Sequence, residues 1–189
     1  MSSIDPKLFV ISGPSGAGKG TLVARVRDQR PDLGLTVSAT TREPRVGEVD
    51  GVNYYFLTDD EFSRRVDAGE FVEWAQVHDH RYGTLASEVE RNLQRGHSLI
   101  LEIDVQGALN VQKRFPGAVP IFIEPPSLDV LRERLIGRGS ETPASLELRL
   151  ADAEHEMGLV DRYDEVVVND DLERATADLL AVLNRHERN

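Results

Sequence analysis

Short runs of apolar residues alternate along the chain with longer segments whose apolar residues recur every three or four positions. This alternation is typical of an α/β fold, here with a parallel five-stranded sheet and helices on both faces. The predicted strands are Leu8–Ser12, Leu35–Ser38, Ser98–Asp104, Val119–Glu124 and Glu165–Asn169. The third and fifth are apolar at consecutive positions, which predicts that both of their faces are covered.

Helical periodicity fills the intervals between these strands. Thr58 with Glu61 has the spacing of a capping box at the start of one helix, and Gly96 is placed to end another. The predicted helices are Lys19–Gln29, Thr58–Val66, Ser87–Arg95, one through Leu128, Leu131 and Leu135, and a last one through Leu172, Ala175, Leu179, Val182 and Leu183.

Two segments interrupt the strand and helix rhythm. Residues 39–85 are expected to be irregular and partly β, with a short strand at Tyr54–Leu57, and they contain Trp74 as an expected core residue. Residues 125–160 are expected to be helical and are rich in arginine. In open α/β sheets ligands bind at the carboxyl ends of the strands, so both segments are predicted to be insertions at that edge.

Composition narrows the possible partners. The chain has 189 residues, 40% of them hydrophobic, which is enough for one domain with a real core. Its net charge of −11 repels nucleic acid and anionic lipid, so neither is an expected partner. A phosphate-bearing ligand must therefore be held by a local basic cluster.

The chain contains no cysteine, which excludes disulfides, thiolate metal sites and cysteine nucleophiles. Residues Met1–Lys7 lack the pattern of a secretory signal, and no apolar run is long enough to span a membrane. We therefore expect a cytoplasmic protein.

A glycine-rich segment follows the first predicted strand and opens the first predicted helix. Its backbone N–H groups and the helix N-terminus can hold phosphates, and Lys19 can reach the β- and γ-phosphates of a nucleotide. The usual pattern has Ser or Thr directly after the lysine, whereas here Gly20 follows and the hydroxyl comes at Thr21, so Mg²⁺ is expected to be held more through water. The alternative is a glycine turn that only closes a strand–helix corner. The segment consists of Gly13, Pro14, Ser15, Gly16, Ala17, Gly18, Lys19, Gly20 and Thr21.

The third predicted strand ends in two acids, Glu102 and Asp104. Because side chains alternate along a strand, both are expected on the same side, toward the ligand edge. Such acids can hold Mg²⁺ through water or accept a hydrogen bond from a ligand. Taken alone, a strand-end acid is also consistent with a cap of the next turn.

A second basic cluster lies between Thr40 and Leu57. Arg42 and Arg45 flank a proline and can form a fork for a second phosphate, to which Tyr54 can donate its hydroxyl. Without the phosphate loop, this segment would read as a solvated loop.

With these motifs the sequence resembles the guanylate kinase family, from the phosphate loop to Asn169-Asp170-Asp171. The family signature, Thr-Ser/Thr-Arg-x-x-Arg followed by an acid, a glycine and Tyr-x-Phe, is matched from Thr40 to Phe56. The resemblance implies one domain of the phosphate-loop NTPase type, with a core at about 1–37, 86–125 and 160–189, a GMP-binding insertion at about 38–85 and a helical lid at about 126–159.

The resemblance also implies roles for individual residues. Residues expected to bind GMP are Ser38, Arg42, Arg45, Tyr54, Glu73, Tyr82, Thr84, Glu102 and Asp104, with Glu73 and Thr84 as readers of guanine. Glu102 is often Asp in relatives, and Asp104 matches an acid near the metal, which it would hold through water. Asn169 matches a position beside adenine. Expected catalytic residues are Lys19, Arg42 and the lid arginines Arg134, Arg138 and Arg149, although each lid arginine could instead pair with Glu133, Glu141 or Glu147.

Together these features predict an enzyme, a guanylate kinase that transfers the γ-phosphoryl of ATP to GMP, and to dGMP, with Mg²⁺, in purine nucleotide metabolism. A monomer or small homo-oligomer is expected. Two alternatives remain open: a non-catalytic guanylate-kinase-like interaction module, and a kinase of this fold for another small phosphate ester.

Overall fold

The computed structural model describes residues 5–77, 79–137 and 143–188. Its main sheet has five strands, all paired in parallel, in the order β2-β7-β1-β8-β9. The predicted fold class is thereby confirmed. The strands are β1 (Leu8–Ser12), β2 (Gly34–Leu35), β7 (Leu99–Glu102), β8 (Val119–Glu124) and β9 (Glu165–Val168).

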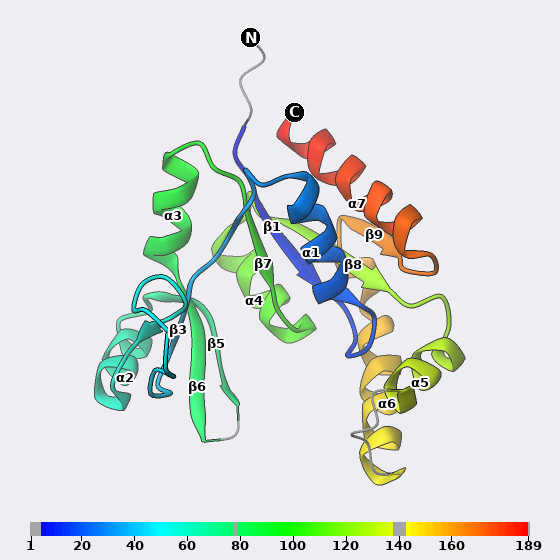
Figure 1. The fold of residues 1–189 in the computed structure, drawn as a ribbon, viewed down its shortest axis with the longest axis horizontal. Coiled ribbons are helices and arrows are strands. Elements are labelled where there is room, and N and C mark those ends of the chain that lie inside the picture. The colour runs from blue at the N-terminus through cyan, green and yellow to red at the C-terminus, as the bar shows by residue number, and fades with distance from the viewer. Residues whose placement is uncertain (1–4, 78, 138–142, 189) are drawn as a thin grey trace.

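Helices cover both faces of this sheet and enclose two apolar layers (Figure 1). On one face α1 (Lys19–Gln29) and α7 (Leu172–Glu187) bury side chains such as Val26 and Leu179 against Phe9 and Ile121. On the other face α3 (Ala86–Gln94) and α4 (Val105–Arg114) pack on Val10 and Phe122. β1 is therefore fully buried, which fixes the position of the loop that follows it.

A second, four-stranded sheet lies in the first interrupting segment, in the order β4-β3-β6-β5. Its strands are β3 (Ser38–Thr40), β4 (Tyr55–Phe56), β5 (Phe71–Val77) and β6 (His80–Leu85), and α2 (Asp59–Asp67) packs Phe62 against Phe71. Thr58 caps α2 by accepting from the backbone N–H of Glu61, but the Glu61 carboxylate bonds to Arg65 instead of returning to complete a capping box.

The remaining helices are α5 (Leu128–Gly137) and α6 (Pro143–Met157), followed by a short 3₁₀ turn at Val160–Arg162. Figure 1 shows α5 and α6 on the opposite side of the molecule from the second sheet, both beyond the carboxyl ends of the β1 and β8 strands, while the two termini lie at the other end. None of the described helices is long and apolar enough to cross a membrane.

Several element predictions were wrong in detail. The predicted strand Leu35–Ser38 is divided: Leu35 pairs with β7 in the main sheet and Ser38 with β6 in the second sheet. The β5–β6 hairpin and helix α4 were not predicted. The predicted strand to Asp104 ends at Glu102, because Asp104 caps α4 by accepting from the N–H of Gly107 at 2.6 Å.

Two exposure predictions were also wrong. β9 is an edge strand whose Val167 is buried under α7, whereas Val166 and Val168 on its other face remain 43% and 40% exposed. Trp74 was expected in the core but is 46% exposed, although its ring meets Phe62 of α2 edge-on at 6.1 Å.

Candidate active site

The loop after β1 is held open by three glycines with left-handed backbone angles. Gly13, Gly16 and Gly18 have φ values of 140°, 92° and 90°, which L side chains rarely adopt. The loop is also packed too tightly for side chains: a Cβ on Gly13 would lie 2.3 Å from the carbonyl oxygen of Ile123. The predicted phosphate loop therefore has the backbone that anion binding requires, directly before the N-terminus of α1.

Asn169 supports this loop from behind. Its buried side-chain amide donates to the backbone carbonyl of Ala17 at 2.7 Å. The backbone carbonyl of Asn169 accepts from the Arg134 guanidinium at 2.8 Å. A Cβ on Gly18 would meet the Asn169 amide at 2.4 Å. The expected place of Asn169 beside adenine stays a prediction, and in this structure the residue fixes the shape of the loop.

The Lys19 ammonium lies folded over the loop. It donates to the carbonyl oxygens of Gly13 at 2.6 Å and Pro14 at 3.1 Å. Its positive charge is therefore held at the loop by the loop's own carbonyl oxygens. A bound phosphate can take over these contacts, because a lysine is a mobile point charge on a flexible stem.

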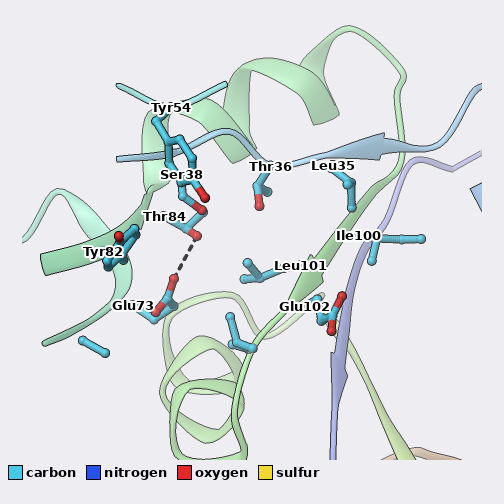
Figure 2. Close-up of a pocket in the computed structure, with 13 residues that line it drawn as sticks. Leu35, Thr36, Ser38, Tyr54, Glu73, Tyr82, Thr84, Ile100, Leu101 and Glu102 are labelled. Atoms are coloured by element: carbon cyan, nitrogen blue, oxygen red, sulfur yellow. Dashed lines mark hydrogen bonds between the residues drawn. The ribbon is translucent and has the colours of Figure 1, made fainter. Parts of the chain in front are cut away.

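A cleft of ≈ 430 Å³ separates the second sheet from the carboxyl end of β7 (Figure 2). It brings together six of the nine residues predicted to bind GMP, on four different strands and one loop. They are Ser38, Tyr54, Glu73, Tyr82, Thr84 and Glu102. Tyr82 lines the cleft and meets the Tyr54 ring edge-on at 6.1 Å.

Glu73 and Thr84 form a hydrogen-bonded pair on neighbouring strands in this cleft. The two residues face each other in the β5–β6 ladder, and the Thr84 hydroxyl donates to Glu73 Oε1 at 2.8 Å (Figure 2). Burial raises the pKa of the Glu73 carboxyl, the Thr84 hydroxyl opposes this, and the negative charge of Asp104 raises the pKa further. Thr84 is fully buried and Glu73 is half-buried, so the pair is largely withdrawn from water.

The two arginines of the second basic cluster differ in their surroundings. Arg42 donates from Nη2 to both carboxylate oxygens of Glu48, at 2.8 and 2.9 Å, and lies over the Tyr54 ring. The Arg45 guanidinium is exposed and makes no hydrogen bond or ion pair with the described residues, while its backbone N–H donates to Glu48. Glu48 thus positions both, a role that the sequence analysis missed although the acid belongs to the matched signature.

The acids near the loop suit a metal that arrives with a nucleotide. Among the described residues no three His, Cys, Asp or Glu side chains are grouped to hold an ion by themselves. One oxygen of Asp104 is already used to cap α4, and Glu102 lies beside the phosphate loop. Mg²⁺ usually keeps several waters and binds through one or two carboxylates plus substrate phosphates, and these oxygen donors fit that arrangement.

The predicted lid arginines that the structure describes contact the phosphate-loop region. Arg134 donates to the Asn169 carbonyl, and Arg149 on α6 donates to the Ser15 hydroxyl at 3.2 Å. Glu147 pairs instead with Arg132. Arg138 lies outside the described residues, as does Glu141.

The fold and this arrangement of phosphate loop and acceptor cleft define a phosphate-loop kinase. The family model for guanylate kinase matches residues 5–186, so the chain belongs to the guanylate kinase family, and the prediction of an enzyme of this family is confirmed.

Known proteins agree with this assignment. A guanylate kinase of Clostridium perfringens is 51% identical over 93% of this chain and 82% of that protein, and one of Thermotoga maritima is 46% identical over 96% and 87%. The crystal structure of guanylate kinase from Anaplasma phagocytophilum superposes with a TM-score of 0.70 and 32% identity, covering 98% of this chain and 88% of that one. A shikimate kinase from Bacteroides thetaiotaomicron, 16% identical with a TM-score of 0.51, shares the fold alone.

The loop geometry predicts that two nearby glycines respond differently to the same substitution. Gly18→Ala should lower the free energy of unfolding by about 1–3 kcal/mol, because it forces a side chain into a left-handed conformation against Asn169. Gly20→Ala is the control: its Cβ would lie 3.6 Å from Glu102, and alanine in the first helical turn should change the unfolding free energy by at most about 1 kcal/mol. Urea unfolding of both variants measures this, and equal losses would contradict the constraint.

Proposed function

We propose that this chain transfers the γ-phosphoryl group of ATP to GMP, giving ADP and GDP, and that it accepts dGMP as well. One observation carries the proposal: a single cleft joins a half-buried carboxylate, hydrogen-bonded to a buried hydroxyl and suited to guanine, with the strand end beside the phosphate loop. Family membership supports it, and a role in purine nucleotide metabolism and GMP recycling follows from the substrates.

On the donor side, the loop from Gly13 to Thr21 would hold the ATP phosphates by its backbone N–H groups and the α1 N-terminus. Lys19 would leave the loop carbonyls for the β- and γ-phosphates. Mg²⁺ bound with ATP would neutralise charge on the β- and γ-oxygens, with Glu102 and Asp104 holding its water shell. Asn169 and Arg134 keep the loop in position on its far side.

On the acceptor side, Arg42 and Arg45 would bind the GMP phosphate, with Ser38, Tyr54 and Tyr82 donating hydroxyls. Arg45 is available at once, whereas Arg42 must exchange part of its contact with Glu48 for the phosphate. A GMP phosphate oxygen is already an anion, so the transfer needs no general base. Catalysis then depends on alignment of the two phosphates and on charge neutralisation.

The base would be read by Glu73 and Thr84. Guanine presents N1–H and the exocyclic N2 amine side by side, and one carboxylate can accept from both. Thr84 has a single hydroxyl proton, which it gives to Glu73 in the unliganded structure. Donation to guanine O6 therefore requires that hydroxyl to rotate, while Glu73 exchanges one donor for two.

The lid would complete the site by moving toward it. Arg134, Arg138 and Arg149 are proposed to approach the transferring phosphoryl group when the α5–α6 segment and the second sheet close over both nucleotides. Closure would exclude water, which otherwise would hydrolyse ATP. The Arg149 contact with Ser15 shows that α6 already reaches the edge of the phosphate loop.

Removal of the loop lysine tests the donor site. Lys19→Ala should lower kcat about 10²-fold, the effect of losing about 3 kcal/mol of transition-state stabilisation, while thermal unfolding remains cooperative. Lys7→Ala is a matched control, since Lys7 pairs with Asp5 at the opposite end of β1. Turnover of the Lys19 variant within threefold of the wild type would show that the loop is structural.

A panel of nucleoside monophosphates, read by ADP release, tests the acceptor assignment. The wild type should prefer GMP to AMP by about 10⁴-fold in kcat/KM, because adenine places a lone pair against Glu73 and leaves its buried charge unpaired. Glu73→Ala should lower kcat/KM for GMP sharply and change it little for AMP.

Glu70→Ala, an exposed acid just before the same strand, serves as the control and should keep the ratio. AMP used within tenfold of GMP by the wild type would refute the assignment. So would a Glu73→Ala variant with full discrimination, because guanine would then be read elsewhere. ATP turnover also separates this function from a non-catalytic interaction module, and the panel separates it from a kinase of another phosphate ester.

The raised pKa of Glu73 predicts a pH dependence for GMP binding. Guanine donors need the ionised carboxylate, so the affinity should fall as the pH is lowered through the raised pKa of Glu73, at a pH above the ordinary range of a glutamate. Calorimetric titration with GMP across this range measures the effect. The Glu73→Gln variant should lose this fall in GMP affinity and keep the pH dependence that comes from the GMP phosphate. Identical affinity profiles of the variant and the wild type would rule out Glu73 as the cause of the fall.

A further inference from the structure

A departure from the usual phosphate-loop pattern lies against an acid of the neighbouring strand. Gly20 stands where a hydroxyl residue normally follows the phosphate-loop lysine. The parallel pairing of Ile11 with Glu102 brings the end of β7 beside the loop. A Cβ built on Gly20 would lie 3.6 and 3.8 Å from the two carboxylate oxygens of Glu102, which is ordinary contact distance.

The hydroxyl of Thr21 does not take the position that a hydroxyl at residue 20 would have. Successive residues of an α-helix are about 100° apart around its axis, so a side chain at position 21 leaves α1 in a different direction from one at position 20. The space beside Gly20 is occupied instead by the Glu102 carboxylate from the neighbouring strand.

Both oxygens of the Glu102 carboxylate are available to accept hydrogen bonds from a ligand. Neither oxygen has a hydrogen-bond or ion-pair partner among residues 5–77, 79–137 and 143–188, although the group lines the cleft. Partial withdrawal from water raises the pKa of Glu102, and the nearby charge of Lys19 opposes that rise. An acid with both oxygens unused, next to a phosphate-binding lysine, is suited to accept hydrogen bonds from the hydration shell of a nucleotide-bound cation.

We propose that Gly20 and Glu102 form a complementary pair, in which the glutamate supplies, through water, the oxygen that a Ser or Thr at position 20 would supply directly. The proposal rests on the function proposed above and assigns Glu102 to the ATP side as a positioning residue for Mg²⁺, not to guanine. The length of the acid matters, because aspartate would withdraw its oxygens by about 1.5 Å, one carbon–carbon bond, and leave the space beside Gly20 empty.

Calorimetric titration with a non-hydrolysable ATP analogue tests this pair without turnover. For each variant the ratio of affinities in Mg²⁺ and in EDTA is measured, with GMP absent. Glu102→Asp should reduce the gain from Mg²⁺ about 10-fold and leave the affinity in EDTA unchanged. Adding Gly20→Ser to Glu102→Asp should restore the gain to within threefold of the wild type, because a hydroxyl then replaces the withdrawn carboxylate.

Gly20→Ala with Glu102→Asp is the matched control, since it fills the same space without a hydroxyl and should not restore the gain. Equal rescue by alanine and serine would overturn the proposal, as would an unchanged Mg²⁺ gain in Glu102→Asp. If Glu102→Asp weakened only the binding of GMP, the proposal would also be overturned, and Glu102 would be assigned to GMP recognition. Failure of the proposed function would appear separately, as absence of GMP turnover by the wild type.

Discussion

The backbone of the phosphate loop is the constraint to which the rest of the molecule is fitted. Its N–H groups can converge only if Gly13, Gly16 and Gly18 adopt left-handed angles, and that shape leaves no room for side chains. Three parts of the chain then pack directly on it: the Ile123 carbonyl of β8, Leu131 and Leu135 of α5, and the Asn169 amide after β9. Strand β8, the residue that follows β9 and helix α5 are therefore positioned by direct contact with the phosphate loop, and a displacement of any of them would change the loop.

The site also shows how an acidic protein can receive two anionic substrates. With a net charge of −11, the surface repels phosphates. The cationic side chains must therefore cluster at the site and must not form ion pairs with acids elsewhere on the surface. Internal partners do this for two cations, because Lys19 donates to loop carbonyls and Arg42 to Glu48, and the neutral Thr84 hydroxyl is held in the same way by Glu73. The ligand contacts proposed for these three groups replace these bonds. Binding is then an exchange of partners in geometry that already exists, which limits the ordering cost.

Much of the fold could be predicted from the sequence because its signals are local. Apolar runs and helical periodicity give the main strands and helices α1, α3, α5 and α7 within a few residues, and the glycine spacing gives the loop. Strand pairing has no comparable local pattern, so the β5–β6 hairpin was missed. For the same reason the division of the predicted strand Leu35–Ser38 between two sheets was missed. Apolar composition alone cannot show that β9 is an edge strand. The Glu48 contact was missed because an acid in an arginine-rich loop reads equally as solvated charge.

The way the second sheet joins the main body has a consequence for how such enzymes diversify. The chain enters this sheet at Ser38 and leaves it at Leu85, and the register pairs Ser38 with Thr84, so entry and exit are adjacent. A segment attached at two neighbouring points can be exchanged for another without rerouting the strands that carry the donor loop. The same nucleotide-binding framework can thus be recombined with new acceptor modules.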